Sequence, residues 1–144
     1  MNKPLKSAKL PFKLDARLDA DCEFVCSLGL CHLLLMNNAS VPWFILVPQV
    51  LGVTELTDLP MLEQQQVLGE INQVTAMIHR LYSPDKLNIG ALGNLVSQLH
   101  LHVIGRFNDD PAWPQPVWGQ LASNAYPEAE LVSQLAKIRA SLVV

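Results

Sequence analysis

The chain has little charge and no surplus of basic residues. Only 16% of its 144 residues are Asp, Glu, Lys or Arg, and the formal net charge at pH 7 is -3. A protein that binds a long nucleic acid needs a basic surface to meet the phosphates. We therefore expect no polymeric nucleic acid as a partner. The low charge is still compatible with a small anionic ligand, because a few local donors can hold one phosphate.

Long hydrophobic runs are also missing. The most apolar region, residues 41–53, is interrupted by Pro42, Pro48 and Gly52, and it is too short to cross a bilayer. Residues 1–13 alternate Lys with Leu and Pro, so they lack the apolar stretch typical of a secretory signal. We expect a cytoplasmic protein that has no membrane partner.

Hydrophobic residues, in contrast, make up half of the chain, and the mean hydropathy is +0.23. A chain of this length fits one domain that buries about two thirds of the surface exposed on unfolding. No internal repeat is visible, so we predict a single domain over residues 1–144. An apolar surplus on a small domain also favours a buried interface between subunits.

Hydrophobic periodicity predicts strands, then a long helix, then strands and a last helix. Two short strands are expected within residues 22–35, with a turn near 27–29. The other expected strands are 43–47, 86–91 and 97–105, and the helices are 59–81 and 127–142. This order, with short links between paired strands, predicts an α+β domain built on an antiparallel sheet.

The long helix has the clearest pattern. Asp58 is the expected cap and Pro60 is expected in the first turn. Spacings of three and four place one apolar stripe against the core, and the polar residues are expected to face outward. The inward set is Leu68, Ile71, Val74, Thr75, Ile78 and Leu81, and the outward set is Gln64, Gln65, Glu70 and Gln73.

Two histidines alternate with apolar residues on the strand predicted over 97–105. Because neighbouring residues of a strand point to opposite faces, Gln98, His100 and His102 are expected to share one face. Solvated surface histidines would give the same spacing. The preceding segment, Asn88 to Asn94, contains two glycines and two asparagines whose backbone N–H groups could approach an anion. Together these features predict a phosphate cradle beside a nucleophile.

The segment Gln98-Leu99-His100-Leu101-His102-Val103-Ile104 resembles the His-φ-His-φ-His-φ-φ signature, where φ is apolar, of the histidine triad family of nucleotide hydrolases and transferases. Residues 43–48, 55–59, the long helix and residues 88–90 are similar to the family in order and spacing. The resemblance covers about residues 15–107. It is closest to a bacterial branch that carries Gln at the first triad position and a tail rich in Trp and Pro.

This resemblance implies the HIT-like fold, an antiparallel five-stranded sheet with one long helix and one C-terminal helix. The domain core would then span about residues 15–107, and an irregular loop and the last helix would fill residues 108–144. The resemblance also implies a homodimer in which two such sheets join into one ten-stranded sheet.

The resemblance further implies an enzyme that cleaves a phosphoanhydride or phosphoramidate of a nucleoside monophosphate derivative. His100 would form a covalent nucleotidyl intermediate, and His102 would hydrogen-bond the phosphate. Gln98 would be the third catalytic residue, and Asn38 would hold the ribose. The implied nucleotide-binding residues are Asn38, Asn88, Gly93, Asn94, Leu95, Gln98 and His102, and no cofactor is implied.

Several positions depart from the family pattern. Gln98 replaces a histidine and cannot shuttle a proton. If this position only orients the substrate, activity survives; if it supplies the leaving-group proton, turnover is slow or confined to good leaving groups. Leu95 stands where a phosphate-binding Ser or Thr is common, and Asn94 where glutamine is usual. Trp43 occupies a position that is often histidine.

Four questions stay open at this level. A zinc site could use cysteines and histidines of two regions, but the Cys-x-x-x-Cys spacing lacks a matching pair, so no metal is expected. Trp113 and Trp118 could pin the tail or form walls over a bound base, and Arg106 could be a surface charge or a phosphate ligand. The pocket could also serve a nucleotide-binding module with little turnover. The zinc candidates are Cys22, Cys26, Cys31, His32, His100 and His102.

Overall fold

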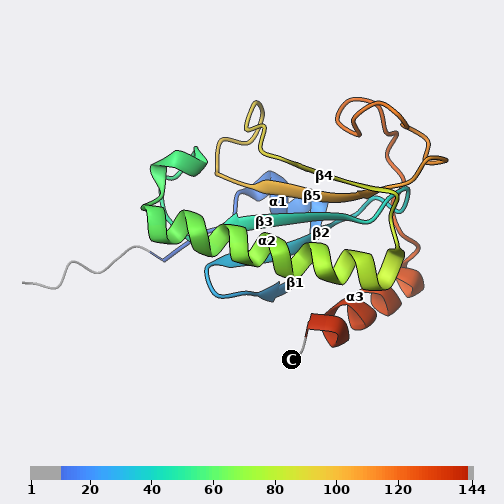
Figure 1. The fold of residues 1–144 in the computed structure, drawn as a ribbon, viewed down its shortest axis with the longest axis horizontal. Helices are drawn as coiled ribbons and strands as arrows, with labels where there is room; N and C mark the ends of the chain where they lie inside the picture. The colour runs from blue at the N-terminus through green and yellow to red at the C-terminus, as the bar shows by residue number, and fades with distance from the viewer. Residues whose placement is uncertain (1–10, 143–144) are drawn as a thin grey trace, which may run out of the picture.

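The computed structural model describes residues 11–142, which form five strands, three α-helices and one short 3₁₀ turn. All neighbouring strands of the sheet are antiparallel, and their order is β1-β2-β3-β5-β4 (Figure 1). The predicted α+β fold with a five-stranded antiparallel sheet is therefore confirmed. The elements are α1 (Ala16–Asp21), β1 (Cys22–Ser27), β2 (Cys31–Met36), β3 (Trp43–Pro48), the 3₁₀ turn (Leu56–Asp58), α2 (Met61–Tyr82), β4 (Lys86–Gly90), β5 (Leu101–Arg106) and α3 (Glu128–Leu142).

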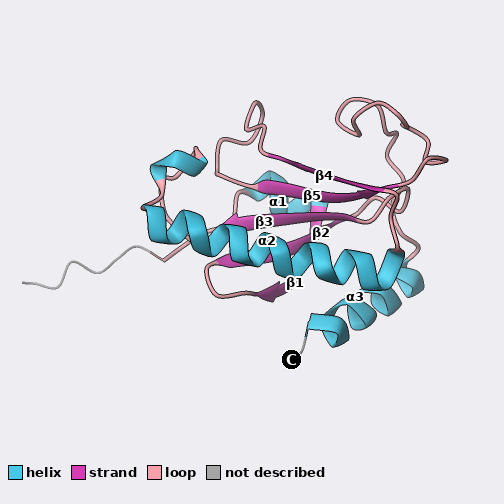
Figure 2. Cartoon of the chain, viewed as in Figure 1, coloured by secondary structure: helices cyan, strands magenta, loops and turns pink. Residues whose placement is uncertain are grey.

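The sheet separates two apolar clusters. The long α2 runs across one face of the sheet, with α3 beside it (Figure 2). Leu101 and Val103 of β5 point into the cluster beneath α2. Ile104, the residue after Val103, packs into the second cluster on the opposite face, together with Trp43 and Val117. The second face is covered by α1 and by the chain that follows β5, and it is the face that carries the histidines.

The buried stripe of α2 differs from the predicted one. Leu68 is 59% exposed, whereas Glu70 is only 4% exposed. Glu70 was expected to face solvent, but its carboxylate accepts the backbone N–H groups of Leu30 and Cys31 at the β1–β2 turn. A buried carboxylate is tolerated here because two otherwise unpaired N–H groups need an acceptor. The buried residues of α2 are Val67, Glu70, Ile71, Val74, Met77 and Ile78.

The start of α2 also differs from the prediction. Asp58 does not cap this helix, because it belongs to the preceding 3₁₀ turn and accepts the N–H groups of Thr54 and Glu55. The residue at the N-cap of α2 is Pro60. The end agrees with the prediction, since Ser83 adopts a left-handed conformation with φ of 47° and Pro84 follows.

Strand β5 begins at Leu101, and the prediction that it starts at residue 97 is wrong. The N–H of Leu99 donates to the carbonyl of Val53, 3.0 Å away, so this segment bonds to a loop instead of a neighbouring strand. His100 therefore lies directly before β5, and His102 is its second residue. Within residues 11–142, no helix combines the length and apolarity that a membrane crossing requires.

Candidate active site

His100 and His102 lie against each other on the face of the sheet opposite α2. Their ring centroids are 5.0 Å apart, at an interplanar angle of 66°. Both are buried, with 7% and 5% of their surface exposed. His102 is paired with Ile45 on β3 and with Gly90 on β4, so its backbone is held from both sides. The expectation that the two rings project from one side is confirmed.

The ring of His100 is oriented by a backbone carbonyl two residues earlier in the chain. Nδ1 lies 2.8 Å from the carbonyl oxygen of Gln98. A carbonyl only accepts hydrogen bonds, so Nδ1 carries the proton of the neutral ring. Nε2 is then left with its lone pair, which is the form that can attack an electrophile.

The ring of His102 has the opposite kind of partner. The indole Nε1 of Trp43 donates to Nδ1 of His102 over 3.0 Å. Since an indole N–H cannot accept, the proton of the neutral His102 ring lies on Nε2. Burial, and then the proximity of His100, lower the pKa of His102 to about 4. His102 is therefore an uncharged hydrogen-bond donor at neutral pH. Sequence reasoning noted Trp43 only as an unusual residue and missed this contact.

Gln98 is engaged by the N-terminal part of the described chain. Its Oε1 accepts the N–H of Asp15, and its Nε2 donates to the carbonyl of Lys13, both over 2.9 Å. Gln98 also lines a cavity of about 350 Å³ with Lys13, Asp15 and Thr54. Its amide thus fixes the segment that leads into α1. The sequence predicted only that Gln98 shares a face with the two histidines, and it gave no sign of these bonds to residues 13 and 15.

Removal of this amide should loosen the N-terminal segment. For Gln98→Ala we expect the free energy of unfolding to fall by about 1–3 kcal/mol, since two hydrogen bonds of about 1 kcal/mol each are lost. Amide hydrogen exchange should accelerate at residues 15–18 and stay unchanged in α2. Ser97→Ala, one residue earlier on an exposed site, is the matched control. Unchanged exchange at residues 15–18 in Gln98→Ala would contradict the anchoring role.

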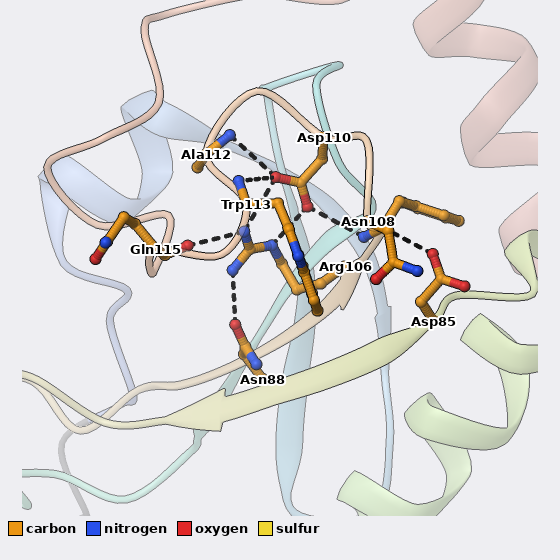
Figure 3. A network of polar contacts seen from close by, with 9 residues as sticks. Asp85, Asn88, Arg106, Asn108, Asp110, Ala112, Trp113 and Gln115 are labelled. Atoms are coloured by element: carbon orange, nitrogen blue, oxygen red, sulfur yellow. Dashed lines mark hydrogen bonds and ion pairs between the residues drawn. The ribbon is translucent and has the colours of Figure 1, made fainter.

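Arg106 is neither a surface charge nor available as a phosphate ligand. It is 1% exposed and forms a two-point ion pair with Asp110, with distances of 2.7 and 3.0 Å (Figure 3). Its Nη1 donates to Oδ1 of Asn88, and Nη2, which also bonds Asp110, donates to the carbonyl of Gln115, both over 2.8 Å. Asn88, expected to bind nucleotide, thus uses its side-chain oxygen to hold Arg106.

Asp110 organises the loop that follows β5. Besides Arg106, its carboxylate accepts the N–H groups of Phe107, Ala112 and Trp113 (Figure 3). Burial works against ionisation, but these hydrogen bonds and the guanidinium outweigh it and lower the pKa of Asp110 to about 2. The carboxylate is charged at any physiological pH, and it fixes the loop in one conformation.

The two tryptophans of this loop do different things. Trp113 packs against the Arg106 guanidinium, 5.6 Å from the ring centroid, and so pins the loop. Trp118 reaches the site, where its ring lies edge-on to His102 at a centroid distance of 5.2 Å. Gly90 makes room for it, because a Cβ there would lie 3.2 Å from the indole. Trp118 also has a buried N–H with no acceptor among residues 11–142. The pinning interpretation thus fits Trp113, whereas the role of Trp118 as a wall over a bound base stays a prediction.

The remaining expected binding residues are Asn38, Gly93, Asn94 and Leu95. Asn38 is 8% exposed, and its amide donates to the carbonyl of Ala122 and accepts the N–H of Ser40. Gly93 has φ of 76°, a conformation that favours glycine, in an exposed loop. Asn94 and Leu95 follow it, and Leu95 is 79% exposed.

The cysteines do not gather around the histidines. Cys22 packs into the cluster on the histidine face, whereas Cys31 and Cys26 belong to the cluster beneath α2. Burial raises the pKa of the Cys22 thiol to about 12. In residues 11–142, no three His, Cys, Asp or Glu side chains are grouped so that they could hold a metal ion.

A sheet of this order, with one long helix behind it and a histidine pair at the start of β5, defines a histidine triad domain. The family model described as the HIT domain matches residues 17–109. The chain belongs to the histidine triad family.

Solved structures of bacterial histidine triad proteins are similar over almost their whole length. The protein from Sinorhizobium meliloti 1021 is 44% identical, with a TM-score of 0.87, over 90% of this chain and 96% of that one. The protein from Marinobacter aquaeolei VT8 is also 44% identical, with a TM-score of 0.88, over 92% and 96%. Diadenosine triphosphate hydrolase from Plasmodium falciparum shares the fold at 14% identity and a TM-score of 0.57, over 96% and 86%. No curated protein matches significantly.

Proposed function

We propose that this chain is a nucleotidyl hydrolase or transferase that uses His100 as its nucleophile. The observation that supports this most is the pair of oriented rings. The bond from Nδ1 of His100 to the Gln98 carbonyl leaves Nε2 unprotonated, and the adjacent His102 has a proton on its own Nε2. A nucleophile beside a neutral donor suits attack on an anionic phosphate, because the donor stabilises negative charge on the phosphate oxygens.

The proposed reaction has two steps. The lone pair on Nε2 of His100 attacks the α-phosphorus of a nucleoside monophosphate derivative. The bond from phosphorus to the leaving oxygen or nitrogen breaks, and its electron pair goes to the leaving group. Water, or an acceptor alcohol or phosphate, then attacks the phosphorus and loses a proton to solvent. The P–N bond breaks, its electrons return to Nε2, and no cofactor takes part.

Gln98 limits the leaving group in this scheme. An amide has no titrating proton, and both ends of this one are bonded to the backbone of residues 13–15. A leaving group that departs without protonation, such as a phosphate of a dinucleoside polyphosphate, is therefore favoured over an alkylamine. The neighbour from Plasmodium falciparum, a diadenosine triphosphate hydrolase, supports the phosphoanhydride class.

The lack of a titrating proton at Gln98 also favours the alternative proposal, a nucleotide-binding module with little turnover. The two proposals are distinguished by incubation with dinucleoside polyphosphates, nucleotide sugars and nucleoside phosphoramidates. The enzyme predicts nucleoside monophosphate release and, after acid-free quenching, a protein mass increased by one nucleotidyl group. Binding of nucleoside monophosphates without product or adduct would establish the module instead.

We also propose that the chain forms a homodimer through one edge of its sheet. At the β1 edge, Arg139 of α3 donates to the carbonyls of Phe24 and Val25 over 2.7 and 2.8 Å, which occupies groups that an added strand would need. The opposite edge is β4, where Ile89 is 50% exposed. Sedimentation at micromolar concentration should give a dimer, and Ile89→Lys should weaken it. A wild-type monomer under these conditions would contradict the proposal.

A further inference from the structure

We propose that Trp43 is a positioning residue, whose indole N–H fixes His102 in the tautomer that carries its proton on Nε2. The effect of this tautomer on catalysis rests on the proposed function, whereas the tautomer itself does not. The inference starts from one short contact, 3.0 Å between the indole Nε1 and Nδ1 of His102, with both residues at least nine-tenths buried.

The sheet itself sets this contact. Trp43 is the first residue of β3 and is paired with Ile104, while His102 is paired with Ile45. The two side chains are thus diagonal neighbours on adjacent strands, at positions that the strand register determines. Their ring centroids are 5.9 Å apart at an interplanar angle of 55°, which leaves the indole edge directed at the imidazole nitrogen. No loop movement is needed to form or keep the bond.

The chemistry of the two partners makes the bond directional. An indole nitrogen donates and never accepts, so Nδ1 of His102 must present a lone pair. At His100 the order is reversed, because its Nδ1 faces a carbonyl that only accepts. Two neighbouring imidazoles are consequently held in opposite tautomers. One presents a lone pair at Nε2 and the other presents a proton there, which divides the roles of nucleophile and donor between chemically identical side chains.

The same bond opposes charge on His102. In the imidazolium form, an N–H on Nδ1 would face the N–H of Trp43, and two donors would meet in a buried space. The rings in contact with His102 are those of His100, Trp43 and Trp118, and among these only His100 has an ionisable side chain. Trp118 approaches edge-on from the loop after β5, and β3 and β4 place the uncharged Ile45 and Gly90 opposite His102.

Nitrogen NMR of the full-length, ¹⁵N-labelled protein tests the proposal without any substrate. In the wild type we expect a coupling across the hydrogen bond between Trp43 Nε1 and His102 Nδ1, and an Nδ1 that stays unprotonated down to about pH 4. A folded protein whose Nδ1 of His102 is protonated at pH 7, or whose indole nitrogen shows no such coupling, would overturn it.

Two matched variants separate the hydrogen bond from aromatic packing. Trp43→Phe keeps a ring in β3 but removes the N–H, and Trp118→Phe removes the other indole that contacts His102. We expect Trp43→Phe to give a mixture of His102 tautomers and a protonation midpoint at least about one pH unit higher, as relief of an unfavourable contact predicts. Trp118→Phe should keep the wild-type tautomer. Equal changes in both variants would assign the effect to packing and overturn the role of Trp43.

Turnover provides the functional readout. Loss of a whole donor lowers kcat by about 10²- to 10³-fold. In Trp43→Phe the decrease in kcat should be smaller, because only part of the His102 population has the wrong tautomer. KM should change little, so the effect should be confined to kcat. If wild-type protein turns over no nucleotide, the proposed function fails while the NMR result still decides the tautomer. A shifted tautomer without any loss of kcat would overturn the catalytic consequence alone.

Discussion

His100→Asn is expected to lower kcat for a nucleotide substrate by about 10⁴- to 10⁶-fold, the range found when the nucleophile or its partner is removed from a hydrolase. Asparagine can still donate an N–H to the Gln98 carbonyl, which His100 Nδ1 contacts over 2.8 Å. It has no nucleophilic nitrogen to replace Nε2, so no nucleotidyl intermediate can form. The measurements are steady-state turnover and the mass of the quenched protein, in which the nucleotidyl adduct should disappear.

His79→Asn is the matched control for this change. His79 lies on the exposed side of α2 near its C-terminus, so the same chemical change there should leave kcat within about twofold, as surface substitutions away from a site do. Nucleoside monophosphate binding should persist in His100→Asn, because the phosphate donor on His102 remains. Turnover at the wild-type rate in folded His100→Asn would reject His100 as the nucleophile.

Asp110→Asn is expected to lower the free energy of unfolding by about 3–5 kcal/mol, the cost of breaking a buried ion pair from one side. The side chains of Arg106 and Asp110 are 1% and 2% exposed, so the guanidinium would be left buried without its counter-charge. The loop would also lose the charged acceptor of three backbone N–H groups. Urea unfolding followed by tryptophan fluorescence measures the loss.

Two comparisons isolate the cause. Asp109→Asn removes the same charge from an exposed neighbour and should change stability by no more than about 0.5 kcal/mol. The double variant Arg106→Met, Asp110→Asn should recover part of the loss, since no charge is then left buried without a partner and the amide oxygen can still accept a loop N–H. A loss below about 1 kcal/mol in Asp110→Asn would show that the pair does not hold the loop.

Regular elements could be predicted from the sequence because their signals are local. The apolar run after Pro42 predicted β3, and spacings of three and four predicted α2 to within two residues at its start. The helix face was harder to place. The burial of Glu70 depends on N–H groups 39 and 40 residues earlier in the chain, which no periodicity reports.

The histidine pair was predictable for the same reason, since alternation along a strand places His100 and His102 on one side. Their partners were not. Trp43 is 59 residues from His102, and Gln98 bonds to backbone 83 and 85 residues away. Nothing in the local pattern marks such pairs. Arg106 and Asp110 do have a spacing of four, but only the fold shows that the pair is buried and organises a loop.

Arg139 has a consequence for how many copies can assemble. A sheet whose two outer strands are both open can add partners at either side without limit, which is the route to fibres. By occupying the carbonyls of Phe24 and Val25, Arg139 leaves each molecule with at most one edge for strand addition. Growth by that route then ends at a closed, two-fold pair.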